Sequence, residues 1–257
     1  MIIQYASDLH LEFPANAAHL LANPIEPVGD VLILAGDITS LSYYKSRRQE
    51  KTFFRTLANQ FRQVYYIPGN HEFYRSLDAR LVDQPFQEAL HPNVFLLNNV
   101  ACTYGGVRFL FSTLWSHIDQ ENEYHVGSGM ADFQLINYHG KRLHPAVYSR
   151  DLHGPSLAFL QSELAKPTTI PTVVVTHHLP SLQCVHPRHV GSSLEQGFAN
   201  DLDKLILDSQ PDYWIYGHSH ANRPPIQVGK TQLVSNMLGY CSMGENADYR
   251  NQALITV

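Results

Sequence analysis

The stretch "VLILAGDI", Val31 to Ile38, indicates the fold class, because five apolar residues in a row run directly into a Gly-Asp turn. A run that is apolar at consecutive positions is typical of a strand buried on both faces. Five further runs have the same character and also end in polar residues: 2–6, 64–67, 109–112, 173–176 and 213–216. These six runs predict the central strands of an α/β fold.

Other segments predict the helices and the antiparallel strands. Apolar residues recur at helical spacing from Phe53 to Phe61, and a second helix is expected to begin near Asp201. The stretch from Gly154 to Ala165 predicts a third helix, with Ser156 as its N-cap. Tight hairpins are expected to join the runs 94–97, 100–104 and 107–112, and also 226–228 and 231–235, before a last strand at 253–257. We therefore expect mixed sheets.

The segment 113–153 lacks the periodicity of regular structure, although it carries Trp115, Tyr124 and several histidines. An irregular insertion of this length inside a compact domain is more often a functional lid than a plain surface excursion. We therefore predict a single domain over residues 1–257 with a lid-like insertion at about 113–153. The two aromatic side chains either stack on an organic leaving group or pack locally, and local packing is slightly preferred.

Composition and charge narrow the classes of function. The 257 residues are 44% hydrophobic and 16% charged, which is enough apolar material for a full core. A formal net charge of -5 argues against a broad nucleic-acid footprint. Three distant cysteines without a CxxC pair indicate a reducing compartment. With no basic signal region and no apolar run of bilayer length, we expect a cytoplasmic protein of unknown oligomeric state, leaving peripheral membrane contact open.

Polar residues with metal-binding side chains follow the ends of the predicted strands. Functional crevices of open α/β sheets lie beyond the carboxyl ends of the strands, so these groups are expected to converge. Residues two apart in an extended segment point to the same side, which lets Asp8 and His10 reach one centre. The seven probable donors are Asp8, His10, Asp37, Asn70, His177, His218 and His220.

Seven donors are too many for one catalytic metal, which usually takes three or four protein ligands and keeps a position open. Two ions that share one bridging carboxylate use them all, and such pairs clamp the attacking and leaving oxygens of a phosphoryl transfer. The donors are oxygen and nitrogen without thiolate, which suits Mn first and also Fe, Zn, Ni or Co. Because only two donors are carboxylates, the pair keeps positive charge that attracts an anionic substrate.

The order of these motifs resembles a known family. The motifs are D-x-H at Asp8 and His10, G-D at Asp37, G-N-H-E from Gly69 to Glu72, a His after a strand at His177, and G-H-x-H at His218 and His220. Together they resemble the calcineurin-like metallophosphoesterase superfamily across residues 8–220, and "SDLHLEF" and "GNHEFY" look especially like its small bacterial members. The resemblance implies a four-layer α/β/β/α sandwich with two mixed β-sheets.

The resemblance also implies a role for each matched residue. One metal is held by Asp8, His10, Asp37 and His220. The other is held by Asp37, Asn70, His177 and His218, so that Asp37 is the bridge. A metal-bridging hydroxide attacks phosphorus in line, while His71 protonates the leaving oxygen or steadies the transition state.

Several neighbouring residues receive less direct roles. Glu72 is expected to support the ligands rather than to bind metal. His178 either faces the substrate or makes a structural hydrogen bond. Asn236 and Tyr240 either border the site or belong to an ordinary turn. The remaining histidines of the insertion are expected to be polar surface more often than substrate contacts: His117, His125, His139, His144 and His153.

The predicted activity is that of a dinuclear metal-dependent phosphohydrolase acting on a phosphodiester or a small-molecule phosphomonoester. A protein Ser/Thr phosphatase is disfavoured, because those relatives carry GDxxDRG and GNHD where this chain has "GDITS" and "GNHE". A non-catalytic binding scaffold of the same fold is also disfavoured, because every ligand position and His71 are retained.

Overall fold

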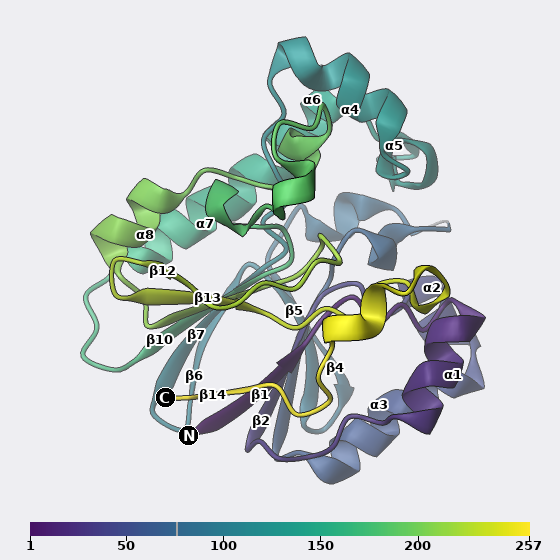
Figure 1. Cartoon of the computed structure of the whole chain (residues 1–257), viewed down its shortest axis with the longest axis vertical. Helices are drawn as coiled ribbons and strands as arrows, with labels where there is room; N and C mark the ends of the chain where they lie inside the picture. Colours follow the sequence, from purple (N-terminus) through teal and green to yellow (C-terminus); the bar gives the residue numbers. More distant parts are fainter. Residues whose placement is uncertain (76) are drawn as a thin grey trace.

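The computed structural model describes residues 1–75 and 77–257 and contains two six-stranded sheets packed face to face (Figure 1). The first sheet has the order β14 (Leu254–Thr256), β1 (Ile2–Ala6), β2 (Val31–Ala35), β3 (Gln63–Ile67), β5 (Val94–Asn98) and β4 (Phe86–His91). Its four central strands are parallel, and the two edge strands are antiparallel to their neighbours. The mixed sheet predicted from the apolar runs is confirmed.

The second sheet has the same plan. Its order is β12 (Ile226–Val228), β13 (Thr231–Ser235), β11 (Tyr213–Tyr216), β10 (Thr172–Thr176), β7 (Val107–Ser112) and β6 (Val100–Tyr104). Strands β13, β11, β10 and β7 are parallel, while β12 and β6 form antiparallel edges. The predicted hairpins that close these two edges are confirmed.

Helices cover the outer face of each sheet. The first sheet is covered by α1 (Pro14–Ala22), α2 (Leu41–Ser46) and α3 (Arg48–Gln60), and the second by α7 (Gly154–Leu164) and α8 (Asp203–Ser209). The predicted four-layer α/β/β/α sandwich is therefore confirmed. Short 3-10 helices fill the connections at His71–Phe73, Ala79–Val82, Gln120–Asn122, Leu182–Cys184, Pro187–His189, Glu195–Gly197, Cys241–Met243 and Glu245–Asp248.

The layers explain why the strands are apolar at consecutive positions. Successive side chains of a strand point to opposite faces of the sheet. In β2, Leu32 therefore packs under the helices, whereas Ile33 packs between the two sheets, and both side chains are fully buried. Each central strand thus contributes to two hydrophobic cores at once.

One predicted turn is wrong. Asn98 and Asn99 do not close a hairpin, because β5 lies in the first sheet and β6 in the second. Their side chains instead fix the crossing between sheets: Asn98 Oδ1 accepts from the Thr113 backbone N–H at 2.9 Å, and Asn99 Oδ1 accepts from Ser112 Oγ at 2.7 Å. Two turn-forming residues are compatible with either connection, and only the sheet partners distinguish them.

The predicted N-cap of α7 is also wrong. A π-helical turn (Tyr148–His153) runs directly into α7, so Ser156 lies inside continuous helix rather than at its start. Its hydroxyl donates to the Leu152 carbonyl oxygen at 2.9 Å, which is a bond within the helix.

The insertion at 113–153, called the cap below, folds over one end of the sandwich (Figure 1). It contains α4 (Glu123–Gly129), α5 (Asp132–Leu135), a small hairpin of β8 (Asn137–Tyr138) and β9 (Lys141–Arg142), and α6 (Pro145–Val147). Trp115 is fully buried against Phe73 and Tyr148. These residues belong to an apolar cluster that joins the cap to the segment after β3 and is separate from the cores of the sandwich. The preferred interpretation, local packing, is therefore confirmed for Trp115. It is wrong for Tyr124, whose side chain is 79% exposed. In the described ranges, no helix combines the length and apolarity needed to span a bilayer.

Candidate metal centre

The loops after the parallel strands of both sheets meet at one edge of the sandwich. Asp8 follows β1, Asp37 follows β2 and Asn70 follows β3, while His177 and His218 follow β10 and β11. All parallel strands of a sheet end at the same edge, and here the two sheets present their ends together. The structure brings all seven predicted donors into two adjoining groups, and each of the seven is buried or nearly so.

The backbone at these loops is unusual. Left-handed φ angles are rare for residues other than glycine and cost on the order of 1–3 kcal/mol each. Five of the seven predicted donors adopt them: Asp8 (55°), His10 (47°), Asp37 (54°), His218 (77°) and His220 (50°). Backbone strain at several residues whose side chains converge is typical of a functional site.

Two glycines permit this convergence. A Cβ on Gly36, whose φ is +90°, would lie 2.4 Å from His177 Nδ1. A Cβ on Gly69 would lie 2.2 Å from Asp37 Oδ1. Both distances are far below van der Waals contact, so only glycine lets these loops approach the imidazole and the carboxylate.

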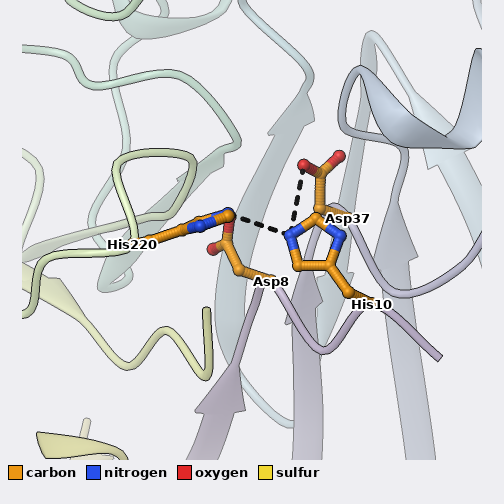
Figure 2. A group of neighbouring side chains, drawn as sticks. All are labelled: Asp8, His10, Asp37 and His220. Carbon is orange, nitrogen blue, oxygen red and sulfur yellow. Dashed lines mark hydrogen bonds and ion pairs between the residues drawn. The ribbon is translucent and has the colours of Figure 1, made fainter. Parts of the chain in front are cut away.

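The first group consists of Asp8, His10, Asp37 and His220 (Figure 2). His10 Nε2 lies 2.9 Å from His220 Nε2 and 3.8 Å from Asp37 Oδ2. His220 Nε2 lies 3.4 Å from Asp8 Oδ1. Ligand atoms about 2.0–2.2 Å from a shared ion lie about 3 to 3.6 Å from one another, so these spacings fit one divalent metal.

The second group is built around His177. Its Nε2 lies 3.4 Å from Asp37 Oδ1, 3.2 Å from Asn70 Oδ1 and 3.2 Å from His218 Nδ1. Asp37 therefore turns one carboxylate oxygen toward each group. This arrangement allows Asp37 to bridge two ions.

The hydrogen bonds of the first group fix the direction of its imidazole lone pairs. His10 Nδ1 bonds to Glu12 Oε1 at 3.1 Å, and His220 Nδ1 bonds to Glu245 Oε2 at 2.8 Å. A ring nitrogen next to a carboxylate carries the proton, so both Nε2 atoms present lone pairs to each other. Two facing lone pairs repel each other. Only a positive species between the two nitrogens, an extra proton or a metal cation, relieves this repulsion.

The second group repeats this pattern with backbone carbonyls. His177 Nδ1 donates to the Ala35 oxygen at 2.9 Å, and His218 Nε2 faces the Gly197 oxygen at 3.4 Å. The two remaining nitrogens then point at each other. Metal-binding histidines commonly donate their other N–H to a carboxylate or a backbone carbonyl in this way.

The field inside both groups favours positive charge. Burial alone would raise the pKa of Asp8 and Asp37, but the surrounding imidazoles, His177 and His220 among them, hold both values below the usual range. Burial would lower the pKa of His220, but Asp8 and Glu245 raise it to about 10. The Asp8 and Asp37 carboxylates thus stay ionised. They attract a cation to the position beside His220 Nε2 that a proton otherwise takes.

Comparison with known proteins agrees with this geometry. Residues 3–222 match the family described as calcineurin-like phosphoesterase. The chain belongs to this family. It is a metal-dependent phosphoesterase, and its two buried Asp and His clusters fit a dinuclear site.

The phosphoesterase is similar to three other proteins along nearly its whole length. The uncharacterized protein L509 of Acanthamoeba polyphaga mimivirus is 29% identical to this chain. The match covers 93% of this chain and 91% of that protein. The crystal structure of phosphopantetheinyl hydrolase from Mycobacterium tuberculosis aligns with a TM-score of 0.72 at 15% identity, covering 98% and 95% of the two chains. A dimetal phosphatase from Danio rerio aligns with a TM-score of 0.49 at 14% identity, covering 91% and 86%.

His71 of the phosphoesterase lies beside the first group. Its Nδ1 bonds to Glu12 Oε1 at 2.9 Å, and its Nε2 lies 3.3 Å from the Tyr240 hydroxyl and 4.0 Å from Asp37 Oδ2. Burial would lower the pKa of His71, but Asp37 and Glu12 raise it above its usual value. His71 Nε2 therefore faces the two groups, and Tyr240 does border the site.

Glu12 was not singled out from the sequence. A single carboxylate oxygen receives both His10 and His71. Burial would raise the pKa of Glu12, but these two bonds lower it to about 2, so the side chain is ionised. The expected strand-like alternation of "SDLHLEF" is wrong, because Asp8 and His10 have left-handed φ angles and Glu12 lies in a turn, so the two-residue spacing does not account for Glu12.

Glu72 has the geometry of a support. Its carboxylate accepts the backbone N–H groups of Asp37 at 3.0 Å, Ile38 at 2.8 Å and Gly69 at 2.6 Å, and it also accepts the Tyr66 hydroxyl. These bonds tie the loop after β2 to the loop after β3. Glu72 thus fixes two ligand loops and uses its oxygens in doing so.

His178 makes structural contacts. Its Nε2 lies 2.7 Å from the Tyr148 hydroxyl, and its ring stacks near Trp115 and His218. Burial and the neighbouring His218 hold its pKa well below the usual value, so the ring is neutral. The structural reading of His178 is the one that the contacts favour, because the ring joins the cap to the second group.

The remaining polar candidates lie apart from the two groups. In the cap, His153 is buried and faces the Leu114 carbonyl oxygen at 3.0 Å, while the other four histidines are exposed. The Asn236 amide donates to the carbonyl oxygens of Tyr5 and Arg250, as expected of a turn residue.

A cap residue that sequence reasoning missed orients Asn70. The Asn70 amide nitrogen donates to Asp132 Oδ1 at 2.8 Å, and the Tyr74 hydroxyl donates to the same oxygen at 2.6 Å. This bond leaves Asn70 Oδ1 directed at His177. Asp132 lies in a segment without periodicity, 62 residues further along the chain, so no local pattern could have indicated it.

We expect an Asp132→Ala variant to bind its second metal about 10- to 100-fold more weakly, which is the usual effect of losing a partner of a ligand. The Asn70 amide nitrogen would keep only its 3.3 Å bond to the Tyr74 hydroxyl, so Oδ1 would be held less firmly toward His177. Metal titration of the metal-free protein measures this change. Asp132→Asn keeps an acceptor oxygen at the same place and should restore affinity; equal losses in both variants would contradict the orienting role.

Proposed function

We propose that the phosphoesterase holds two divalent ions between the two groups, with Asp8, His10, Asp37 and His220 on one ion and Asp37, Asn70, His177 and His218 on the other. The observation that carries this proposal is the pairing of ring nitrogens, His10 with His220 and His177 with His218. When bound, such ions polarise the phosphoryl oxygens and activate water for in-line attack. We propose Mn²⁺ as the preferred ion, since the donors are hard oxygens and imidazoles.

The residues of the chain itself position the reaction. His71 holds a proton on the side of the first group, where it protonates the leaving oxygen. Glu12 keeps the His71 ring in place through Nδ1, so that Nε2 faces the site beside Tyr240. Glu72 holds the loops that carry Asp37 and Gly69, which keeps the ligand geometry fixed before substrate binds.

We propose a phosphodiester or a small-molecule phosphomonoester as substrate. In support of a small substrate, the cap contacts the site on one side, through Asp132 to Asn70 and through Tyr148 to His178. The second motif reads Gly36-Asp37-Ile38-Thr39 and lacks the longer charged continuation of the Ser/Thr phosphatases. We further propose that the chain acts as one domain with the cap as its lid, in a reducing cytoplasm that matches its three unpaired cysteines.

Chelation tests the metal requirement. We expect the purified protein to hydrolyse p-nitrophenyl phosphate or bis-p-nitrophenyl phosphate with Mn²⁺ present, and to lose that activity in EDTA. Release of p-nitrophenol is followed at one wavelength, with elemental analysis of the same sample. Activity should return on adding Mn²⁺ to the dialysed protein. Undiminished turnover in protein that elemental analysis shows to be free of metal would refute the proposed mechanism.

A further inference from the structure

We propose that a small apolar cavity beside the metal centre binds the hydrocarbon part of the phosphoester substrate. This inference rests on the proposed function, because the phosphate must lie on the metal centre for the cavity to receive its ester group. The substrate class is a phosphoester whose alcohol carries a benzene-sized or short alkyl group close to the ester oxygen.

The cavity has a volume of about 150 Å³. Its apolar walls are formed by Leu179, Val185, Leu194 and Phe198, and Ser219 also lines it. A cavity of about 150 Å³ with apolar walls stays dry in other proteins and binds benzene. The walls and the size therefore select one compact hydrocarbon group.

The cavity adjoins the predicted ligands of the second group. The Phe198 ring lies 4.7 Å from the His218 ring, centroid to centroid, at an angle of 33°. Ser219 stands between His218 and His220 in the chain, and it lines the cavity. We therefore place the ester group of a phosphate bound at the metal centre on the Phe198 side of His218.

Close packing against the cap fixes the size of the cavity. Leu194 packs on Gly129 of α4, where an added Cβ would come within 2.5 Å of Leu194 Cδ2. Close to this wall, a Cβ on Gly197 would lie 2.0 Å from Met130 Sδ, so the neighbouring chain also packs tightly on the cap. The contact with Gly129 leaves Leu194 no room to retreat, so the cavity should discriminate by length.

The lining also argues against a polar or charged substituent. Neither Lys nor Arg is among the described residues that line the cavity, and the nearby guanidinium groups of Arg188 and Arg223 bond to His189 and to the Val185 carbonyl oxygen. The acidic residue of the lining, Glu195, accepts the Gly191 backbone N–H at 2.9 Å. His186 and His189 also line the cavity. On the side formed by Leu179, Val185, Leu194 and Phe198, the polar groups of a sugar phosphate or a nucleotide would find no hydrogen-bond partner.

Phosphonates that are not hydrolysed test binding without turnover. Calorimetry on the Mn²⁺-loaded protein compares benzylphosphonate with methylphosphonate. Burying the ring is expected to make benzylphosphonate bind at least about tenfold more tightly. Among alkyl phosphoesters of the class that the protein hydrolyses, kcat/KM should rise about fourfold per added methylene until the cavity is full.

Two variants at Leu194 locate the effect. Leu194→Trp fills the cavity and should abolish the preference for the benzyl group while methylphosphonate binds unchanged. Leu194→Ala enlarges the cavity and should move the longest favoured alkyl chain upward by one or two carbons, a change that partial misfolding cannot produce. Leu207→Trp is the matched control, because Leu207 is 48% exposed on α8 and does not line the cavity.

The outcomes separate the two proposals. Turnover and methylphosphonate binding without any preference for longer groups would overturn the cavity proposal and leave the proposed function standing. Absence of turnover for every ester, together with absence of phosphonate binding in the metal-loaded protein, would overturn the proposed function and this inference with it. Preference that Leu194→Trp leaves unchanged would show that the hydrocarbon binds elsewhere.

Discussion

We expect Asp37→Asn to lower kcat/KM by more than about 1,000-fold and to reduce the bound metal to less than one ion per chain. Loss of a single preorganised group that stabilises charge costs about 100- to 1,000-fold, and Asp37 serves both groups through its two oxygens. Asparagine keeps the shape of the side chain but removes the negative charge that both cations share. Steady-state kinetics and elemental analysis of one preparation measure the two effects.

The matched control for this variant is Asp208→Asn. Asp208 is 64% exposed and pairs with Lys204 on α8, so its replacement should leave both kinetics and metal content at the level of the unmodified protein. An Asp37→Asn protein that still binds two ions and turns over within about tenfold of the original would mean that Asp37 does not bridge. Circular dichroism should be unchanged in both variants.

The second large effect is expected for His71→Ala. General acid catalysis contributes about 100- to 10,000-fold, so hydrolysis of an alkyl phosphoester should fall by that factor. The loss should be much smaller for a p-nitrophenyl ester, because p-nitrophenolate leaves without needing a proton. His71 Nε2 lies 4.0 Å from Asp37 Oδ2 and outside both groups, so two metals should remain bound.

The comparison of leaving groups distinguishes an acid from a ligand. If the His71→Ala variant hydrolyses both esters more slowly by the same factor and also loses metal, His71 binds an ion. If it lowers neither ester, the leaving oxygen takes its proton from elsewhere. His125→Ala is a suitable control, because His125 is an exposed histidine of the cap and should change neither rate.

The donors that follow β1 and β2 depend on an unusual backbone conformation. Asp8, His10 and Asp37 each stand within a few residues of a strand end, and their left-handed φ angles turn the side chains back toward the site. Such strain persists only where the surroundings fix it. At Asp37, Glu72 provides that restraint by accepting four backbone N–H groups from two loops, those of Asp37, Ile38, Thr39 and Gly69.

The sequence by itself determined the central strands, the α/β class and the donors at the strand ends, whereas the four-layer arrangement was implied by the family resemblance. These features are local: a continuous apolar run identifies a buried strand, and the polar residues that follow it are adjacent in the chain. Parallel strands end at one edge, so the convergence of Asp8, Asp37 and His177 also followed. The family motifs then supplied the division of these donors between two ions.

Only the tertiary structure decided which distant residues support and surround those donors. Asp132 reaches Asn70 from the cap, Glu12 joins His10 to His71, and the wall of the apolar cavity depends on Leu194 packing against α4. The crossing between the two sheets at Asn98 also depends on a distant residue, because Asn98 accepts a hydrogen bond from the Thr113 backbone N–H. Such contacts join residues whose separation along the chain follows no period, so their pairing is set by packing in three dimensions.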